Sequence, residues 1–211
     1  MNAIRVSKSA GLRLGMILTA MLLMVSCLPA NGSEAVITVT GTLSGGRDDY
    51  RIFGMGRSMP KGTPYTIVFT FDGTKGKGMP AGCPGSGSRI VGGGQASPGT
   101  AVITINGKSY EFGHKPDARS RTWRSIATLC SDSEIGIAVE EGPHSVTSGV
   151  NIKIRPNQGQ RSLTQNGDWR GALSLSSFDA RNGDNAFAIR RNYSSETMSY
   201  LAVDSVTVSG R

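Results

Sequence analysis

The chain has 211 residues and a formal net charge of +8, with 29 glycines and only 18% charged residues. Few charges and abundant glycine are typical of short strands joined by turns, and they exclude a protein built mainly from helices. The moderate positive charge favours an anionic polymer over nucleic acid as a partner, although a basic domain without any charged partner fits equally well.

The first segment is expected to direct export. Three basic residues open it, an apolar run from Met16 to Leu28 follows, and small and polar residues come next. This order is typical of a secretory signal peptide, and so short an apolar run does not span a bilayer. We therefore predict that residues 1–32 are cleaved and that residues 33–211 form one exported domain. All three leader charges are basic, so cleavage lowers the net charge to about +5.

Cys27 leaves a second route to the cell surface open. The segment 24–27 is similar to the lipobox of bacterial lipoproteins, in which lipid is attached to a cysteine that becomes the first residue. Met24 stands where a leucine is usual in that motif. Ordinary cleavage after Gly32 or Ala35 is the alternative, because small residues precede both sites at the required spacing.

Period-two alternation of apolar and polar residues predicts strands along the rest of the chain. The strongest is Tyr65–Phe71. An Asn106-Gly107 pair between Ala101–Ile105 and Lys108–Phe112 predicts a hairpin, because these two residue types adopt the positive φ angles of a type I′ turn. The remaining predicted strands are Ala35–Leu43, Trp123–Leu129, Ile135–Val139, Val150–Arg155, Ala172–Phe178, Asn185–Arg190 and Met198–Val208. We therefore expect an all-β fold, a single antiparallel β-sandwich with a jelly-roll-like arrangement.

One segment interrupts this pattern. Gly73–Gly99 contains ten glycines and three prolines, which predicts a long Gly-rich loop. Cys83 lies within it, and Cys130 is the other cysteine that remains after the leader. In an oxidising compartment the two are expected to form a disulfide that closes a loop of about 48 residues and stabilises the fold by about 4 kcal/mol. Two free, buried thiols are the alternative.

The segment 89–93, Arg-Ile-Val-Gly-Gly, is similar to the activation site of trypsin-like serine proteases. The segment 167–171 has tryptophan where that family has its nucleophilic serine. A catalytic triad needs serine, histidine and aspartate within hydrogen-bond reach, so the sequence favours a protein that is not an enzyme. A secreted hydrolase with an unfamiliar site on the rim of the Gly73–Gly99 loop remains the alternative function.

Asp179, Asn182 and Asp184 share one turn, and oxygen-rich loops of this kind can bind calcium. The spacing differs from that of an EF-hand loop, however, and Arg181 within the turn opposes a cation. Asparagine and aspartate are also common turn residues. We therefore expect no metal and no cofactor.

Aromatic side chains can stack on sugar rings, and the candidates here are Trp123, Trp169, Tyr193 and Tyr200. Arg119, Arg121 and Arg124 flank Trp123, so an anionic glycan could meet stacking and charge together at that position. Trp169 follows a turn and is the second tentative ligand-binding residue. The alternative is that both tryptophans belong to the core.

The segment Gly41–Asp72 combines an early strand, a Phe53-Gly54 loop and a strand that ends in Phe-Thr-Phe-Asp. It resembles the N-terminal domain of exported bacterial proteins that often carry a PEP-CTERM-type sorting tail. The segments 103–112 and 204–208 fit the same resemblance. It implies an exported β-sandwich without known catalytic residues, and the sorting tail itself is expected to be absent after Val208.

These observations together predict a non-catalytic binding or structural module. Its expected location is the periplasm, the outer-membrane surface or the extracellular space. The expected partner is an anionic polysaccharide or another polymer of the cell envelope, and no transmembrane segment is expected in the mature chain.

Overall fold

The computed structural model describes residues 34–72, 75, 77–80, 87–93, 97–113, 124–130, 134–142, 146–155, 157, 173–175, 178–180 and 184–210. All of them belong to one compact unit, Gly32–Arg211. For β4, β5 and β8, whose bounds are given next, the backbone alone is described.

The described strands form one antiparallel sheet. In chain order they are β1 (Glu34–Asp48), β2 (Ser58–Met59), β3 (Pro64–Asp72), β4 (Lys77–Pro80), β5 (Gly87–Gly93), β6 (Gly99–Ile105), β7 (Lys108–Phe112), β8 (Arg124–Cys130), β9 (Glu134–Glu141), β10 (Ser148–Ile154), β11 (Leu173–Leu175), β12 (Ala186–Arg190) and β13 (Glu196–Gly210). Their order across the sheet is β4-β5-β8-β9-β10-β12-β13-β1-β3-β6-β7, with β2 paired to β1 and β11 paired to β13.

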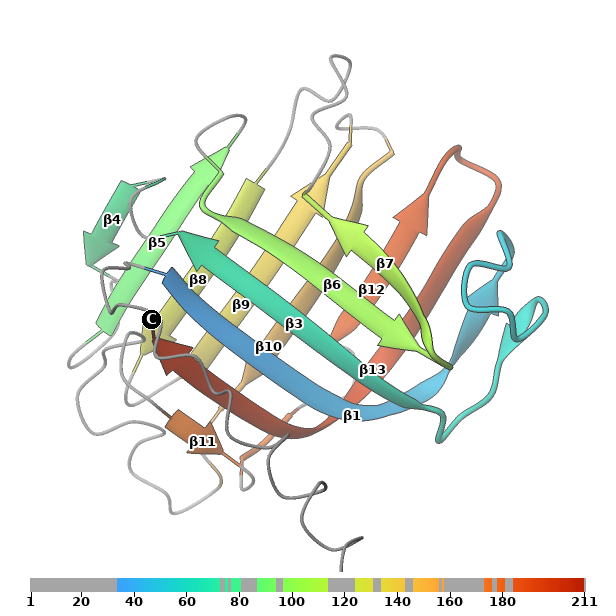
Figure 1. Cartoon of the computed structure of the whole chain (residues 1–211), viewed down its shortest axis with the longest axis horizontal. Helices are drawn as coiled ribbons and strands as arrows, with labels where there is room; N and C mark the ends of the chain where they lie inside the picture. Colours follow the sequence, from blue (N-terminus) through green and yellow to red (C-terminus); the bar gives the residue numbers. More distant parts are fainter. Residues whose placement is uncertain are drawn as a thin grey trace, which may run out of the picture. The chain divides into compact units, whose positions relative to one another are not determined.

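The sheet curls over itself, so that its two halves face each other. β6 and β7, at one end of the strand order, contact β8, β9 and β10. In Figure 1, β1, β3, β6 and β7 lie in front, and β8, β9, β10 and β12 cross behind them at a steep angle. An antiparallel sheet buries one face and leaves the other accessible to water. The curl therefore encloses a single apolar core.

Two irregularities bend β1 where it pairs with β13. The register shifts between Thr40 and Gly41, and again between Leu43 and Gly46. A Cβ on Gly41 would lie 1.9 Å from the carbonyl oxygen of Ala202, so only glycine permits this close approach of the two backbones. Bulges of this kind increase the local twist of a strand. Both strands are accordingly long and bent in Figure 1.

The core follows the alternation that the sequence predicted. The buried side chains include Ile37 and Val39 of β1, Ile67, Phe69 and Phe71 of β3, and Ala101, Ile103 and Ile105 of β6. After β1 the chain turns back into this core through Phe53, whose ring packs edge-on against Phe187 of β12 at 5.7 Å. This contact holds the loop after β1 against the strand that carries part of the site described below.

The Asn106-Gly107 hairpin is confirmed. β6 and β7 pair in register from Ala101 opposite Phe112 to Ile105 opposite Lys108. Asn106 and Gly107 have φ angles of 51° and 69°, the two positive values that a type I′ turn requires. The Asn106 side chain also donates a hydrogen bond to the carbonyl oxygen of Phe53 at 3.2 Å, which joins this hairpin to the loop after β1.

The all-β prediction with antiparallel pairing is confirmed, whereas a jelly-roll sandwich is not, because the described strands belong to one continuous sheet. The prediction of a long loop over Gly73–Gly99 is wrong in part, since β4 and β5 lie within it. β5 pairs with β4 on one side and with β8 on the other. β5 forms because its backbone hydrogen bonds to β8, although its sequence lacks the apolar alternation that would have predicted a strand. The protease-like segment 89–93 lies within β5.

No helix that could span a bilayer occurs in the part of the chain that the structure describes.

Candidate binding site

Three adjacent strands bring the charged centre of the site together. β12 pairs with β13 so that Arg190 lies opposite Glu196. On the other side of β13, β1 places Arg47 opposite Met198, two residues beyond Glu196 on the same face. Diagonal neighbours on one face of a sheet are about 7–8 Å apart, within reach of long side chains. The register therefore surrounds one carboxylate with two guanidinium groups.

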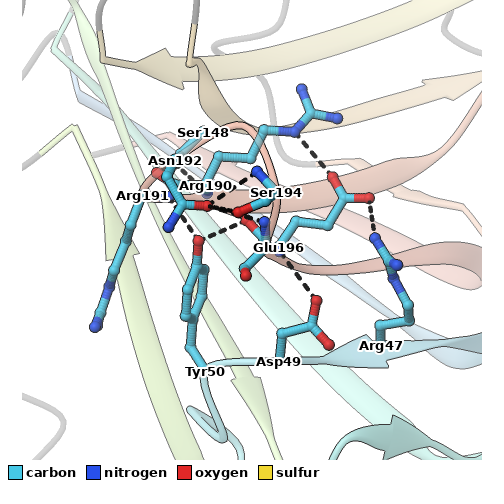
Figure 2. Close-up of polar contacts among 10 residues, drawn as sticks. Arg47, Asp49, Tyr50, Ser148, Arg190, Arg191, Asn192, Ser194 and Glu196 are labelled. Atoms are coloured by element: carbon cyan, nitrogen blue, oxygen red, sulfur yellow. Dashed lines mark hydrogen bonds and ion pairs between the residues drawn. The ribbon is translucent and has the colours of Figure 1, made fainter.

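Glu196 binds both arginines. Arg47 donates from Nη2 to Oε1 at 2.7 Å, and Arg190 donates from Nε to Oε2 at 2.9 Å. The Glu196 side chain is only 18% exposed, whereas those of Arg47 and Arg190 are 57% and 45% exposed. Figure 2 shows the two arginines meeting the carboxylate from different sides. A mostly buried acid thus holds two accessible cations.

The turn between β12 and β13 is organised by Asn192. Its Oδ1 accepts hydrogen bonds from the backbone N–H groups of Ser194 at 3.0 Å and Ser195 at 2.9 Å. Asparagine commonly stabilises turns in this way. Tyr193, in the middle of the turn, is 81% exposed. The turn therefore carries an accessible aromatic ring beside the two arginines.

Tyr50 fastens this turn to the loop after β1. Its phenol donates to the carbonyl oxygen of Ser195 at 2.5 Å and accepts from the N–H of Arg191 at 2.9 Å. The Arg191 guanidinium lies 4.9 Å from the centroid of the Tyr50 ring, a cation–π distance. In Figure 2, Arg191 points away from the Glu196 carboxylate. It therefore adds a cation to the same end of the sheet without joining the Glu196 cluster.

Side-chain hydrogen bonds also fix the backbone of Arg190 and Glu196. The Ser148 hydroxyl of β10 accepts from the N–H of Arg190 at 2.8 Å and donates to its carbonyl oxygen at 3.2 Å. The Asp49 carboxylate accepts from the N–H of Glu196 at 3.2 Å. These contacts fix the residues that carry the charges before any ligand arrives.

A fully buried carboxylate anchors the loop after β1. Asp48 lies opposite Thr197 of β13, and its Oδ1 accepts from the Thr197 hydroxyl at 2.9 Å and from the N–H of Ile52 at 2.8 Å. Its Oδ2 accepts from the N–H of Phe53 at 2.9 Å. The two backbone bonds hold the loop against the end of β1, and the Thr197 bond joins Asp48 to β13, the strand that bears Glu196.

Cations gather around this loop. Arg51 and Arg57 hydrogen bond through their backbones to Asp48, and the Lys108 ammonium lies against Gly54. We use the name basic end for the six cations of segments 47–57, 106–108 and 190–196, which are Arg47, Arg51, Arg57, Lys108, Arg190 and Arg191. The same segments contain three carboxylates, those of Asp48, Asp49 and Glu196. The basic end therefore carries a net positive charge.

Tyr110 of β7 borders the basic end. Its phenol donates to one oxygen of Glu141 at 3.0 Å, and the N–H of Gly113 donates to the other at 2.8 Å. Burial raises the pKa of the Tyr110 phenol, the Glu141 carboxylate raises it further, and the positive charge of Arg191 lowers it. Arg191 of the β12–β13 turn is therefore close enough to Tyr110, on the edge strand β7, to influence the ionisation of its phenol.

A pocket of about 300 Å³ opens at the β12–β13 turn, and we call it the arginine pocket. Its lining residues are Arg47, Arg190, Asn192, Tyr193, Ser194, Ser195 and Glu196. The volume is at the lower end of the range for small-molecule pockets. Two arginines and one glutamate leave one excess positive charge, and the other lining groups are an amide, hydroxyls and a phenol. This chemistry suits a small, polar, monoanionic group.

Most of the platform predicted from the sequence lies outside the described residues. Arg119, Arg121, Trp123 and Trp169 lie outside the described residues. Arg124 begins β8, where its backbone pairs with that of Glu140 on β9. Both tyrosines named as stacking candidates are accessible, Tyr193 at 81% and Tyr200 at 49%. Of the predicted aromatic groups, Tyr193 is therefore the one that the described structure places at a pocket.

The cysteines and the calcium candidates are only partly described. Cys27, Cys83 and Asn182 lie outside the described residues, and Cys130 ends β8. Asp179 forms a backbone bridge with Arg155, and the Asp184 carboxylate lies 3.6 Å from the Arg155 guanidinium. A cation thus already neighbours the acidic turn. Within the described residues, no group of three histidine, cysteine or acidic side chains could hold a metal.

Sequence reasoning missed Arg47, Arg190 and Glu196. One signal was present, because paired arginines precede Asn192-Tyr193 in a short turn between two predicted strands. Arg47 had no such signal, since it is 149 residues away from Glu196 in the chain.

No protein-family model matches this chain, and no curated protein or solved structure is significantly similar to it. Guanidinium groups form strong, directional hydrogen bonds with carboxylates and other oxyanions. A tyrosine ring presents a flat apolar face with a polar edge. The arrangement can bind an acidic, ring-containing ligand.

Proposed function

We propose that this protein is an exported, non-catalytic binding module for anionic polysaccharide and that the basic end contacts the polymer. The observation that carries the proposal is the arginine pocket, where two guanidinium groups and an exposed tyrosine line one cavity. Anion recognition needs only these groups, correctly placed. The pocket supports the role as a binding module, and the predicted leader, residues 1–32, supports export.

The polymer would contact more than the pocket. Arg51, Arg57 and Lys108 are exposed and lie around the same loop. A chain of repeated negative charges can bind several of these cations at once, and each exposed ion pair contributes about 0.2–1 kcal/mol. Several weak contacts of this kind give binding that falls as salt rises.

The register of β5 supports the disulfide that an exported protein would carry. Gly87 of β5 is the Cα partner of Cys130 in β8. Cys83 is only four residues before Gly87 in the sequence. The chain therefore pairs with Cys130 shortly after Cys83. We therefore propose the Cys83–Cys130 bond together with export.

The test is binding of the mature protein to alginate, dextran sulfate and neutral dextran over a salt series. Replacing Arg51, Arg57 and Lys108 by glutamine should weaken binding to the anionic polymers by roughly 3- to 150-fold, the range that three exposed ion pairs imply. Neutral dextran should not be retained.

A matched pair of variants locates the surface. Lys108→Gln removes one charge at the basic end, whereas Lys75→Gln removes one next to Asp72, at the opposite end of β3. We expect weaker binding only for Lys108→Gln. Equal losses for both variants would show that net charge, and not the basic end, determines binding, and no retention of the wild type would refute the proposed function.

A further inference from the structure

We propose that Glu196 is a positioning residue that holds Arg47 and Arg190 as a preformed pair for one carboxylate of a uronic-acid-containing polysaccharide. This inference rests on the proposed function and names its ligand class. The pair would bind the acidic group of a single sugar, while the rest of the basic end contacts the polymer less specifically.

The geometry makes Glu196 the fixed member of the cluster. Its side chain is the least exposed of the three, and Asp49 holds its backbone N–H. Each carboxylate oxygen binds a different arginine, Oε1 binding Arg47 and Oε2 binding Arg190. The exposed side chains of Arg47 and Arg190 are thus both hydrogen bonded to the same fixed carboxylate.

Each arginine keeps donors for a ligand. Arg47 uses Nη2 and Arg190 uses Nε in the contacts with Glu196. A guanidinium group has five N–H donors, and the other nitrogens of both residues have no hydrogen-bond partner among the described residues. Both residues line the arginine pocket.

Charge and shape favour a carboxylate. The two arginines and Glu196 together carry one excess positive charge, which one monoanionic group neutralises. A planar carboxylate matches the planar arginine fork. Tyr193 stands at the same pocket with an exposed ring, and a uronic acid joins a carboxylate to a sugar ring that could lie against it.

A positioning role for Glu196 and simple electrostatic attraction predict opposite changes in ligand affinity for the substitution Glu196→Gln. Glu196→Gln removes a negative charge beside the pocket, so simple attraction predicts tighter binding of an anion. If Glu196 instead holds the arginines in place, the variant must order both side chains when the ligand binds. Ordering two such side chains weakens binding by about 5- to 150-fold. The added positive charge offsets part of this loss, so we expect Glu196→Gln to bind about 3- to 10-fold more weakly.

The experiment is calorimetric titration of the mature protein with oligogalacturonate, with low-mass dextran sulfate as the sulfated probe. The charge-matched control is Asp204→Asn, which removes an exposed carboxylate from the same strand. It should bind as well as the wild type or slightly better. A second pair keeps the test independent of the folding of Glu196→Gln. Arg190→Lys loses the planar fork and should weaken oligogalacturonate binding, whereas Arg155→Lys, which is outside the basic end and beside Asp184, should not.

Each outcome decides the inference. Weaker oligogalacturonate binding by Glu196→Gln, without an equal loss for dextran sulfate, supports it. Equal or tighter oligogalacturonate binding overturns the positioning role while leaving the binding function in place. Equal losses for both polymers overturn the carboxylate assignment. Failure of the wild type to bind either polymer refutes both the inference and the proposed function.

Discussion

Replacing Asp48 by asparagine tests how the loop that bears the basic end is held. The carboxylate is fully buried and accepts from the N–H groups of Ile52 and Phe53 and from the Thr197 hydroxyl. Asparagine keeps the shape but has one acceptor oxygen, so its amide nitrogen must face one of these donors. One buried donor is then left without a partner.

The expected cost follows from those three bonds. An unsatisfied buried donor costs about 1–3 kcal/mol, and each remaining bond weakens from a charge-assisted to a neutral one, a further loss of about 1 kcal/mol. Removing the buried charge offsets part of this loss, because its desolvation penalty disappears. We expect Asp48→Asn to lower the free energy of unfolding by about 2–4 kcal/mol.

Urea unfolding at pH 7, followed by circular dichroism, measures this difference. The control is Asp49→Asn at the neighbouring position, where the carboxylate accepts from the N–H of Glu196 at 3.2 Å and is only partly buried. That variant should lose less than about 1 kcal/mol. If Asp48→Asn costs no more than Asp49→Asn, the buried carboxylate does not anchor the loop and the reasoning is wrong.

Two further predictions concern stability. Burial raises the phenol pKa of both Tyr65 and Tyr110, helped by Asp204 and by Glu141 respectively. A group whose pKa is higher in the folded state contributes stability that is lost as pH rises, so the contribution of these two tyrosines to the free energy of unfolding should be complete below about pH 10 and fall above it. A Tyr110→Phe variant with the same alkaline loss as the wild type would contradict this. The Cys83–Cys130 disulfide predicts no free thiol in the denatured mature protein and a loss of about 4 kcal/mol on reduction; two titratable thiols would exclude it.

The strands were predictable because their signal is local. Alternation along Tyr65–Phe71 and the Asn106-Gly107 pair depend only on neighbouring residues, and both predictions are confirmed. β4 and β5 were not predictable in the same way, because the glycine-rich segment that contains them has almost no apolar alternation. Their pairing with each other and with β8 supplies order that no local pattern encodes.

The sequence by itself determined the all-β class, the positions of most strands and the residues that face the core, since side-chain alternation is fixed by strand geometry. It also named Tyr193 as a stacking candidate. Only the tertiary structure decided that Arg47 meets Arg190 at Glu196. That meeting depends on the register of β1, β12 and β13, and a shift of one residue would turn each side chain to the other face of the sheet. Two bulges in a strand pair that joins distant parts of the chain set that register.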